Sequence, residues 1–232
     1  VDRLGDVDPS QMGTDFFTRL QTAPMGVITN GATWDPATRE LNISVTTNMT
    51  QATTGAYTVA CVLTEDGVTG TGAGYNQANA YAGGNNGVMG GFEALPSPVP
   101  AAQMVYDHVA RAIAPSFTGQ TGVIPTSTSV GSTYTANFSF TLPSTWDETQ
   151  MHIVGMLIDP QGKIDNAGYT NIDSAVINGY VAGVEEISGV LLEQMLVVAP
   201  NPATDFTNIT MHIPSKAQVS LKVLDAKGSI LQ

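Results

Sequence analysis

The sequence predicts an all-β protein: an antiparallel β-sandwich or jelly-roll-like domain with one inserted short helix, then part of a second, smaller β-sandwich. Three observations support this fold class. The 232 residues include 24 Gly and 13 Pro, which favours short strands joined by turns. Several segments alternate apolar and polar residues at strand spacing. Hydrophobic residues make up 42% of the chain and charged residues only 12%, as in a globular protein with a core.

The alternation is clearest in the first third of the chain. Three strands are expected there, over residues 25–35, 40–50 and 55–67. In the second strand, Leu41, Ile43 and Val45 are expected to face the core while the residues between them face solvent. In the third, Cys61 shares a face with apolar neighbours two positions away. A single cysteine in that setting predicts a buried, unreactive thiol.

Strand signals return after residue 130. Residues 132–143 alternate in the same way, and residues 150–172 are expected to form a hairpin that turns at DPQGK. The predicted core of this part consists of Phe138, Phe140, Trp146, Ile153 and Leu157.

Two intervening segments do not have strand character. Residues 67–91 contain nine glycines and four asparagines, which predicts a long irregular loop, and such loops are often functional. Residues 101–115 show apolar residues at helical spacing, so a helix ending at Pro115 is expected there, with Asp107 and Arg111 as an ion pair four residues apart. The residues expected to contact a ligand are Tyr75, Asn76, Asn79, Tyr81 and Phe92, because aromatic side chains on a loop combine apolar area with hydrogen-bonding neighbours.

The domain boundaries follow from a loss of pattern near residue 182. The sequence predicts a β-sandwich domain over residues 1–182, a linker over 183–194 and a second β unit over 195–232. If the second unit lacks strands, its edges are expected to pair within the unit or with a neighbouring molecule.

The second unit begins with the turn PNPATD and reaches another turn, DAKG, about twenty residues later. The residues that define these turns are Pro200, Asn201, Pro202, Ala203, Asp205 and Gly228. This pattern resembles the C-terminal sorting domain of proteins exported by the type IX secretion system, and it implies that secretion machinery as a partner. Sorting domains of that family continue to a basic C-terminus. The segment is therefore expected to be a truncated sorting domain that is not competent for export by itself.

The larger part carries a second resemblance. His108 and Arg111 form an H-x-x-R pattern, followed by Trp146 and the strand MHIVGMLID, with VDR at the start and Tyr-Asn-Gln at 75–77. Over most of residues 1–185 these positions resemble the Omp28-like family of outer membrane proteins. That resemblance implies a lipoprotein or secreted surface protein with no established reaction. Full-length members have a thioredoxin-like N-terminal region that is not in this sequence.

The charge balance narrows the choice of partners. The formal net charge is −12, so nucleic acid is not expected as a partner.

No run of eighteen apolar residues exists, so no transmembrane segment is expected. The leading hypothesis is a non-enzymatic binding or structural domain, exported to the extracellular side or the outer-membrane surface, with an unknown protein or glycan ligand and no cofactor.

Two other functions stay open. A hydrolase would need a site near His108 and the glycine-rich loop, where a carboxylate and a nucleophile would have to converge. A calcium-dependent adhesion or glycan-binding module would use acids that the sequence places in turns, although their spacing does not match the twelve-residue calcium loop. These acids are Asp2, Asp6, Asp8, Glu65, Asp66, Asp159 and Asp165.

Ser174 is a candidate for O-glycosylation. It lies in IDSAVI, and the Asp-Ser-hydrophobic motif is similar to the one that bacteria with type IX secretion glycosylate. If residues 172–176 form a strand, Ser174 shares a face with Ile172 and Val176, which argues against exposure.

Overall fold

The computed structural model describes residues 11–182, 196–199 and 208–211. The chain divides into two compact units, Val1–Val184 and Glu185–Gln232.

The first sheet of the larger unit has three strands. They are β1 (Gly26–Asp35), β2 (Glu40–Met49) and β7 (Thr133–Thr141), and they lie in the order β1-β2-β7. Both pairs are antiparallel, and the β1–β2 hairpin turns through the PATR segment that the sequence marks as a turn.

The second sheet has four strands in the order β5-β4-β8-β9, again with every pair antiparallel. These are β4 (Thr58–Glu65), β5 (Val109–Ala114), β8 (Met151–Ile158) and β9 (Ile164–Asn171). The predicted DPQGK turn joins β8 to β9. Two short strands, β3 (Thr53–Thr54) and β6 (Ser127–Thr128), pair separately. The prediction of antiparallel sheets is therefore confirmed, in a mostly β domain that also contains two α-helices among its described residues.

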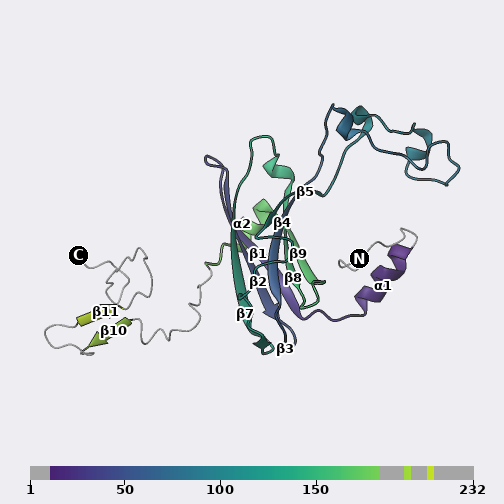
Figure 1. Ribbon diagram of the computed structural model, residues 1–232. Helices are drawn as coiled ribbons and strands as arrows, with labels where there is room; N and C mark the ends of the chain where they lie inside the picture. Colours follow the sequence, from purple (N-terminus) through teal and green to yellow (C-terminus); the bar gives the residue numbers. More distant parts are fainter. Residues whose placement is uncertain (1–10, 183–195, 200–207, 212–232) are drawn as a thin grey trace. The chain divides into compact units, whose positions relative to one another are not determined.

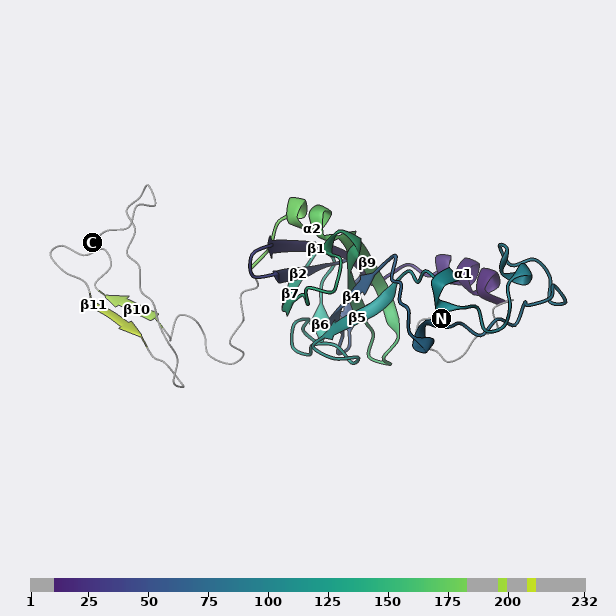
Figure 2. The ribbon, with the colours of Figure 1, turned by 90° about the horizontal axis from the view of Figure 1, so that it is seen from above.

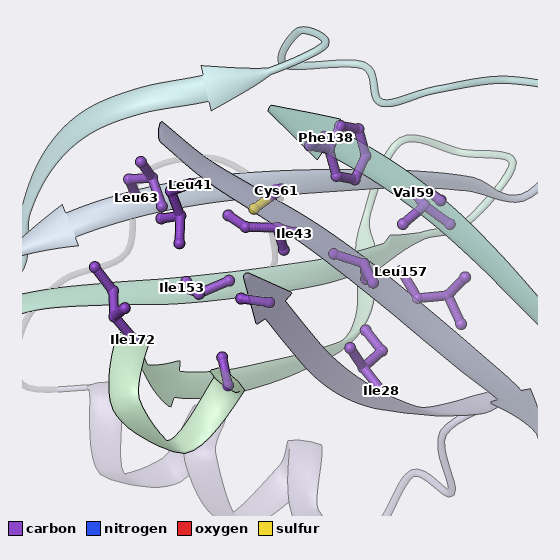
Figure 3. Close-up of a cluster of buried hydrophobic side chains, with 14 of the residues drawn as sticks. Ile28, Leu41, Ile43, Val59, Cys61, Leu63, Phe138, Ile153, Leu157 and Ile172 are labelled. Atoms are coloured by element: carbon purple, nitrogen blue, oxygen red, sulfur yellow. The ribbon is translucent and has the colours of Figure 1, made fainter. Parts of the chain in front are cut away.

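The core lies between these two sheets (Figures 1 and 3). Its fully buried side chains include Leu41, Ile43 and Val45 of β2, Val59, Cys61 and Leu63 of β4, and Ile153 and Leu157 of β8. Phe138 is also buried as predicted, whereas Phe140 and Trp146 are half-buried and pack against the edge of the core. Burial raises the pKa of the Cys61 thiol to about 12, so the prediction of an unreactive thiol fits its surroundings.

The α-helices of the structure lie outside residues 101–115, where the sequence predicts one. The two α-helices among the described residues are α1 (Met12–Leu20) and α2 (Ile172–Asn178). Single 3₁₀ turns are η2 (Ala73–Tyr75), η3 (Phe92–Ala94), η4 (Ala101–Gln103) and η5 (Glu148–Gln150). In the part of the chain that the structure covers, no helix has the length and apolar character to span a membrane.

The inserted helix predicted over residues 101–115 is wrong. That segment forms η4, an irregular stretch and then strand β5, which pairs with β4 so that Glu65 lies opposite Val109 and Cys61 opposite Ala114. The apolar residues at helical spacing also fit a strand, and the ladder to β4 supplies the hydrogen bonds that decide between the two. Long-range pairing here overrides the local pattern.

The predicted ion pair between Asp107 and Arg111 is wrong for the same reason. Without a helix the two side chains do not meet. Arg111 instead donates from Nε to Glu65 Oε2 at 2.6 Å, and Asp107 Oδ1 accepts from the backbone N–H of Gly67 at 2.9 Å.

Strand β2 is covered on both faces near its middle. Ser44 is fully buried, although alternation places it on the solvent side. The backbone N–H of Val181 donates to Ser44 Oγ at 3.0 Å, and Asn178 Nδ2 donates to the carbonyl oxygen of Asn30 at 2.9 Å. The chain after α2 therefore lies across the outer face of the three-stranded sheet. It approaches so closely that a Cβ at Gly31 would stand 1.8 Å from the carbonyl oxygen of Gly179.

The smaller unit contains one described pair of strands. Strand β10 (Leu196–Ala199) runs antiparallel to β11 (Asn208–Met211), with Ala199 opposite Asn208. The predicted linker and all the sorting-motif residues lie outside the described residues: Pro200, Asn201, Pro202, Ala203, Asp205 and Gly228.

Candidate functional site

The long excursion between β4 and β5 is the part of the larger unit that lies farthest from its sheets. We call residues 67–107 the arm. Figures 1 and 2 show that it leaves the end of β4, extends away from both sheets and returns to the start of β5. The sequence predicts a loop for the first two thirds of this segment. The structure extends that loop as far as His108.

Two isolated β-bridges join the outgoing and returning chains of the arm. Val68 and Tyr106 exchange both backbone hydrogen bonds at 2.9 Å, and Gln77 and Val99 do so farther out. The Tyr106 hydroxyl also donates to the carbonyl oxygen of Tyr75 at 2.9 Å. The proximal arm is thus a paired structure and not a slack loop.

The distal arm is organised around Asn79, which is only 9% exposed. Its side-chain amide nitrogen donates to the carbonyl oxygen of Phe92 at 2.7 Å and lies within reach of those of Leu95 and Pro96. Its Oδ1 accepts from the backbone N–H of Tyr81 at 3.0 Å. One buried amide therefore joins both sides of the distal arm, as buried polar groups must find partners.

The tip of the arm presents apolar side chains to solvent. Val88 is 86% exposed, Met89 50% and Phe92 37%. The turn that carries them is held by Glu93, whose Oε2 accepts from the backbone N–H groups of Met89 and Gly91. The hydrogen bond from Met89 is the main cause that lowers the pKa of the Glu93 carboxyl, so this acceptor stays charged near neutral pH.

A reciprocal pair of carboxylate contacts closes the arm where it meets the sheet. Asp66 Oδ1 accepts from the backbone N–H of His108 at 2.6 Å, and Asp107 Oδ1 accepts from that of Gly67 at 2.9 Å. Both Gly67 (φ 68°) and His108 (φ 56°) are left-handed, a conformation natural for glycine and uncommon for other residues. Each chain of the arm therefore turns sharply at the same level.

Two histidines converge on the carboxylate of Asp66. His108 Nδ1 lies 3.0 Å from Oδ1, and His152 Nδ1 of β8 lies 3.6 Å from Oδ2. Tyr169 of β9 stacks on the His152 ring at 4.6 Å between centroids and meets the His108 ring edge-on at 6.2 Å. We call this cluster the arm base; it consists of Asp66, Asp107, His108, His152 and Tyr169.

The negative charge of Asp66 contributes to a pKa shift within the arm base. The pKa of the Tyr169 hydroxyl is raised, first by desolvation and then by the negative charge of Asp66. Tyr169 is therefore neutral over the physiological pH range, and its ring serves as a stacking surface for His152.

A buried ion pair between strands β4 and β5 lies next to the arm base. Glu65 is 5% exposed; its Oε2 accepts from Arg111 and its Oε1 accepts from the backbone N–H of Asp147 at 2.9 Å. The Arg111 guanidinium also lies over the Trp146 ring, 5.6 Å from its centroid. Residues on either side of Glu65 and Arg111 are therefore fixed, which positions Asp66 and the start of β5.

The His108 ring in the arm base faces a carboxylate and an aromatic ring. It contacts Asp66 and Tyr169, and among the residues described no serine, threonine or cysteine side chain is hydrogen-bonded to it. Cys61 is fully buried in the core between the sheets (Figure 3). The hydrolase hypothesis requires a carboxylate and a nucleophile near His108, and the described contacts of that ring include the carboxylate alone.

The turn acids considered for calcium have other partners. Asp159 Oδ1 accepts from the backbone N–H groups of Gln161 and Lys163, and Asp165 Oδ2 accepts from that of Met25. Over the described ranges, no three His, Cys, Asp or Glu side chains form a group that could hold a metal ion. Asp2, Asp6 and Asp8 lie outside those ranges.

A family profile, Outer membrane protein Omp28, matches residues 5–179. The chain belongs to the Omp28 family of outer membrane proteins. A solved domain of the outer membrane lipoprotein Omp28 from Porphyromonas gingivalis is similar to it, at 11% identity and a TM-score of 0.38, over 65% of this chain and 90% of that one. No curated protein matched. Membership in the Omp28 family indicates the outer membrane as the location.

Within this Omp28 domain, the five residues expected to contact a ligand have different surroundings. Tyr75 and Phe92 are exposed, and Tyr81 is half-buried. The side chains of Asn76 and Asn79 are used inside the arm, since Asn76 Oδ1 accepts from the backbone N–H of Ala101 at 2.9 Å. The side chains of these two asparagines therefore stabilise the fold of the arm and are not free to contact a ligand.

Sequence reasoning did not single out the most exposed apolar pair, Val88 and Met89. The available signal was VM between two glycine-rich runs, where large apolar side chains have no strand to pack on. The arm base was also missed, because Asp66 follows β4 while His152 lies in β8 and Tyr169 in β9, and only the fold brings them together.

Ser174 lies in helix α2 and not in a strand. Its side chain is exposed, while Ile172 and Ala175 are the buried residues of the helix. The strand-based argument against its exposure is therefore wrong, because a helix rotates neighbouring side chains by about 100°. Glycosylation of Ser174 stays a prediction.

Proposed function

We propose that this Omp28 domain is a non-enzymatic binding domain displayed at the outer-membrane surface, and that it contacts its partner with the tip of the arm. The exposed apolar cluster of Val88, Met89 and Phe92 is the observation that carries this proposal. Apolar side chains held on an ordered projection are costly to leave in water unless a partner covers them.

The internal structure of the arm supports the same function. Its two β-bridges, the buried Asn79 and the Glu93 turn hold the tip in one shape before any partner arrives. Pre-organisation of this kind reduces the entropy lost on binding. A loop whose role was only to connect β4 to β5 would need few residues, because the two strands are direct neighbours.

Photo-crosslinking in the native bacterium tests the proposal. A diazirine amino acid at Val88 is expected to give a discrete adduct upon irradiation, which mass spectrometry identifies as a protein or a glycan. A matched probe at Ile177 on helix α2, which is 84% exposed, is expected to give none. Equal labelling from Val88 and Ile177, or no adduct from either, would rule out the arm tip as the contact surface.

We also propose that the protein reaches the surface through type IX secretion. The support is the resemblance of the turns at Pro200–Asp205 and Asp225–Gly228 to sorting domains. In native cells with an inactivated type IX translocation channel, the protein is expected to become inaccessible to protease added outside and to accumulate in the periplasm. Unchanged surface accessibility would refute this route and would leave the crosslinking result standing.

A further inference from the structure

We propose that this domain forms a two-fold dimer in which helix α1 of each copy lies on the outer face of the other copy's four-stranded sheet. Two apolar surfaces of the larger unit carry the inference. One is an arc of α1, and the other is the face of the β5-β4-β8-β9 sheet that points away from the core. The dimer goes beyond the proposed binding role of the arm and does not depend on it.

Helix α1 turns its apolar side to solvent. At about 100° per residue, its large apolar side chains share one arc and its polar side chains the opposite arc. The polar arc holds the helix to the domain, because Arg19 donates to the carbonyl oxygen of Ile164 at 3.3 Å and to that of Asp165, both at the start of β9. An amphipathic helix of a monomer usually has the reverse orientation. The four apolar side chains, between 59% and 66% exposed, are Met12, Phe16, Phe17 and Leu20.

The outer face of the four-stranded sheet carries an apolar row that crosses all four strands. From β5 to β9, the residues in register along this row are Ile113, Val62, Val154 and Tyr169. The two valines are half-buried and pack against a small apolar cluster around Met156 that is separate from the core between the sheets. Ile113 is 39% exposed and Tyr169 55%. Because the solvent face of an antiparallel sheet is normally polar, this row indicates a face that another element covers.

The helix and the row match in size and in charge. Nine helical residues span about 14 Å, which is also the width of three strand spacings of about 4.8 Å. Neither the apolar arc of α1 nor the row contains a charged residue. This matters for self-association, because each copy has a formal net charge of −12 and charged surfaces would repel one another. A helix laid on a sheet is also an ordinary two-layer packing.

A second copy can cover both surfaces at once. Arg19 holds α1 at the edge strand β9, and none of the nine residues of the helix is buried in this position. In a two-fold arrangement each helix keeps this tether and covers the row of the other copy. Four side chains that are about 60% exposed offer roughly 500 Å² per helix. With an equal area of sheet, two such contacts bury on the order of 2,000 Å², which is enough for a stable dimer.

Sedimentation equilibrium of the full chain tests the dimer, with twice the mass of the chain expected at micromolar concentration. The variant Phe16→Ser, Phe17→Ser and the single variant Val154→Thr change the two surfaces separately. Each is expected to raise the dissociation constant at least about tenfold, because the apolar contact is lost twice per dimer. Ile177→Ser, on the 84% exposed side chain of α2, is the matched control and should leave the constant unchanged.

Three outcomes would overturn the dimer: a monomer at all concentrations, a dimer that resists both surface variants, or a monomer that floats with phosphatidylcholine vesicles. The last would assign the apolar surfaces to lipid.

Cross-linking distinguishes a second copy from the helix of the same chain. Single variants Phe17→Cys and Val154→Cys are mixed and treated with a short bismaleimide; the buried Cys61 thiol, whose pKa is about 12, does not compete. A covalent dimer is expected in the mixture at higher yield than in either variant alone. If the chain that carries both substitutions gives only an internal link, α1 covers its own sheet and the dimer is refuted.

Discussion

Replacing Gly31 with alanine is expected to lower the free energy of unfolding by about 3 kcal/mol or more. The added Cβ would stand 1.8 Å from the carbonyl oxygen of Gly179 and 2.9 Å from Ser44 Oγ. Because the first contact is with backbone, the segment after α2 must move, and it then loses its hydrogen bonds to Asn30 and Ser44. Denaturant unfolding would measure the loss as a lower midpoint with an unchanged slope.

Gly74→Ala is the matched control for this substitution. A Cβ at Gly74, in the arm, has no atom within 4 Å, so the same chemical change meets open space. Its unfolding midpoint is expected to stay close to that of the unmodified protein. Similar losses from both variants would show that the cost arises from glycine itself and not from the close approach of residue 179.

Glu65→Gln is expected to cost about 3–5 kcal/mol, the usual penalty for leaving one member of a buried ion pair without its partner. The amide keeps the size of the side chain and can still accept from the backbone of Asp147, but Arg111 then retains a half-buried charge with no counter-ion. The pair of Arg39 and Glu148 provides the contrast, because the Glu148 side chain is 40% exposed and that of Glu65 only 7%. Glu148→Gln is therefore expected to have a smaller effect, since solvent screens this carboxylate more.

The double variant Glu65→Gln, Arg111→Met distinguishes a broken ion pair from a packing defect. Methionine keeps much of the Arg111 stem against Trp146 while it removes the charge, so a substantial part of the loss should be recovered. Additive losses in equilibrium unfolding would show that the two side chains are not coupled and would contradict the assignment of this pair as the brace of the arm base.

The strands that carry strong alternation could be predicted from the sequence. Residues of β2, β4 and β8 repeat apolar side chains every second position, and the structure buries those side chains between the sheets. The β8–β9 hairpin was also predictable, because DPQGK supplies turn residues between two such runs. Local pattern sufficed where one strand face is apolar and the turn is short.

Strand β5 and the arm base could not be predicted in this way. VARAIA fits a helix and a strand equally well, and only the free edge of β4 decides between them. The partners of Asp66 are 42 and 86 residues away along the chain, so no spacing rule connects them. For the residues expected to contact a ligand, the sequence indicates an irregular loop but does not distinguish an inward amide such as Asn79 from an outward side chain.

The arm connects two strands that are paired with each other, so its sequence and length can change without a change in the sheet. Glu65 and Val109 are direct partners in the β4–β5 ladder, so the sheet itself fixes the ends of the arm at the spacing of adjacent strands, about 5 Å. For a flexible connection between fixed ends, each doubling of length costs only about 0.6 kcal/mol. Segments of other length and sequence can therefore be grafted between these two residues with little effect on the sheets below. Under the proposed binding role of the arm, its contact surface can change at that one insertion point while the core sequence stays constrained.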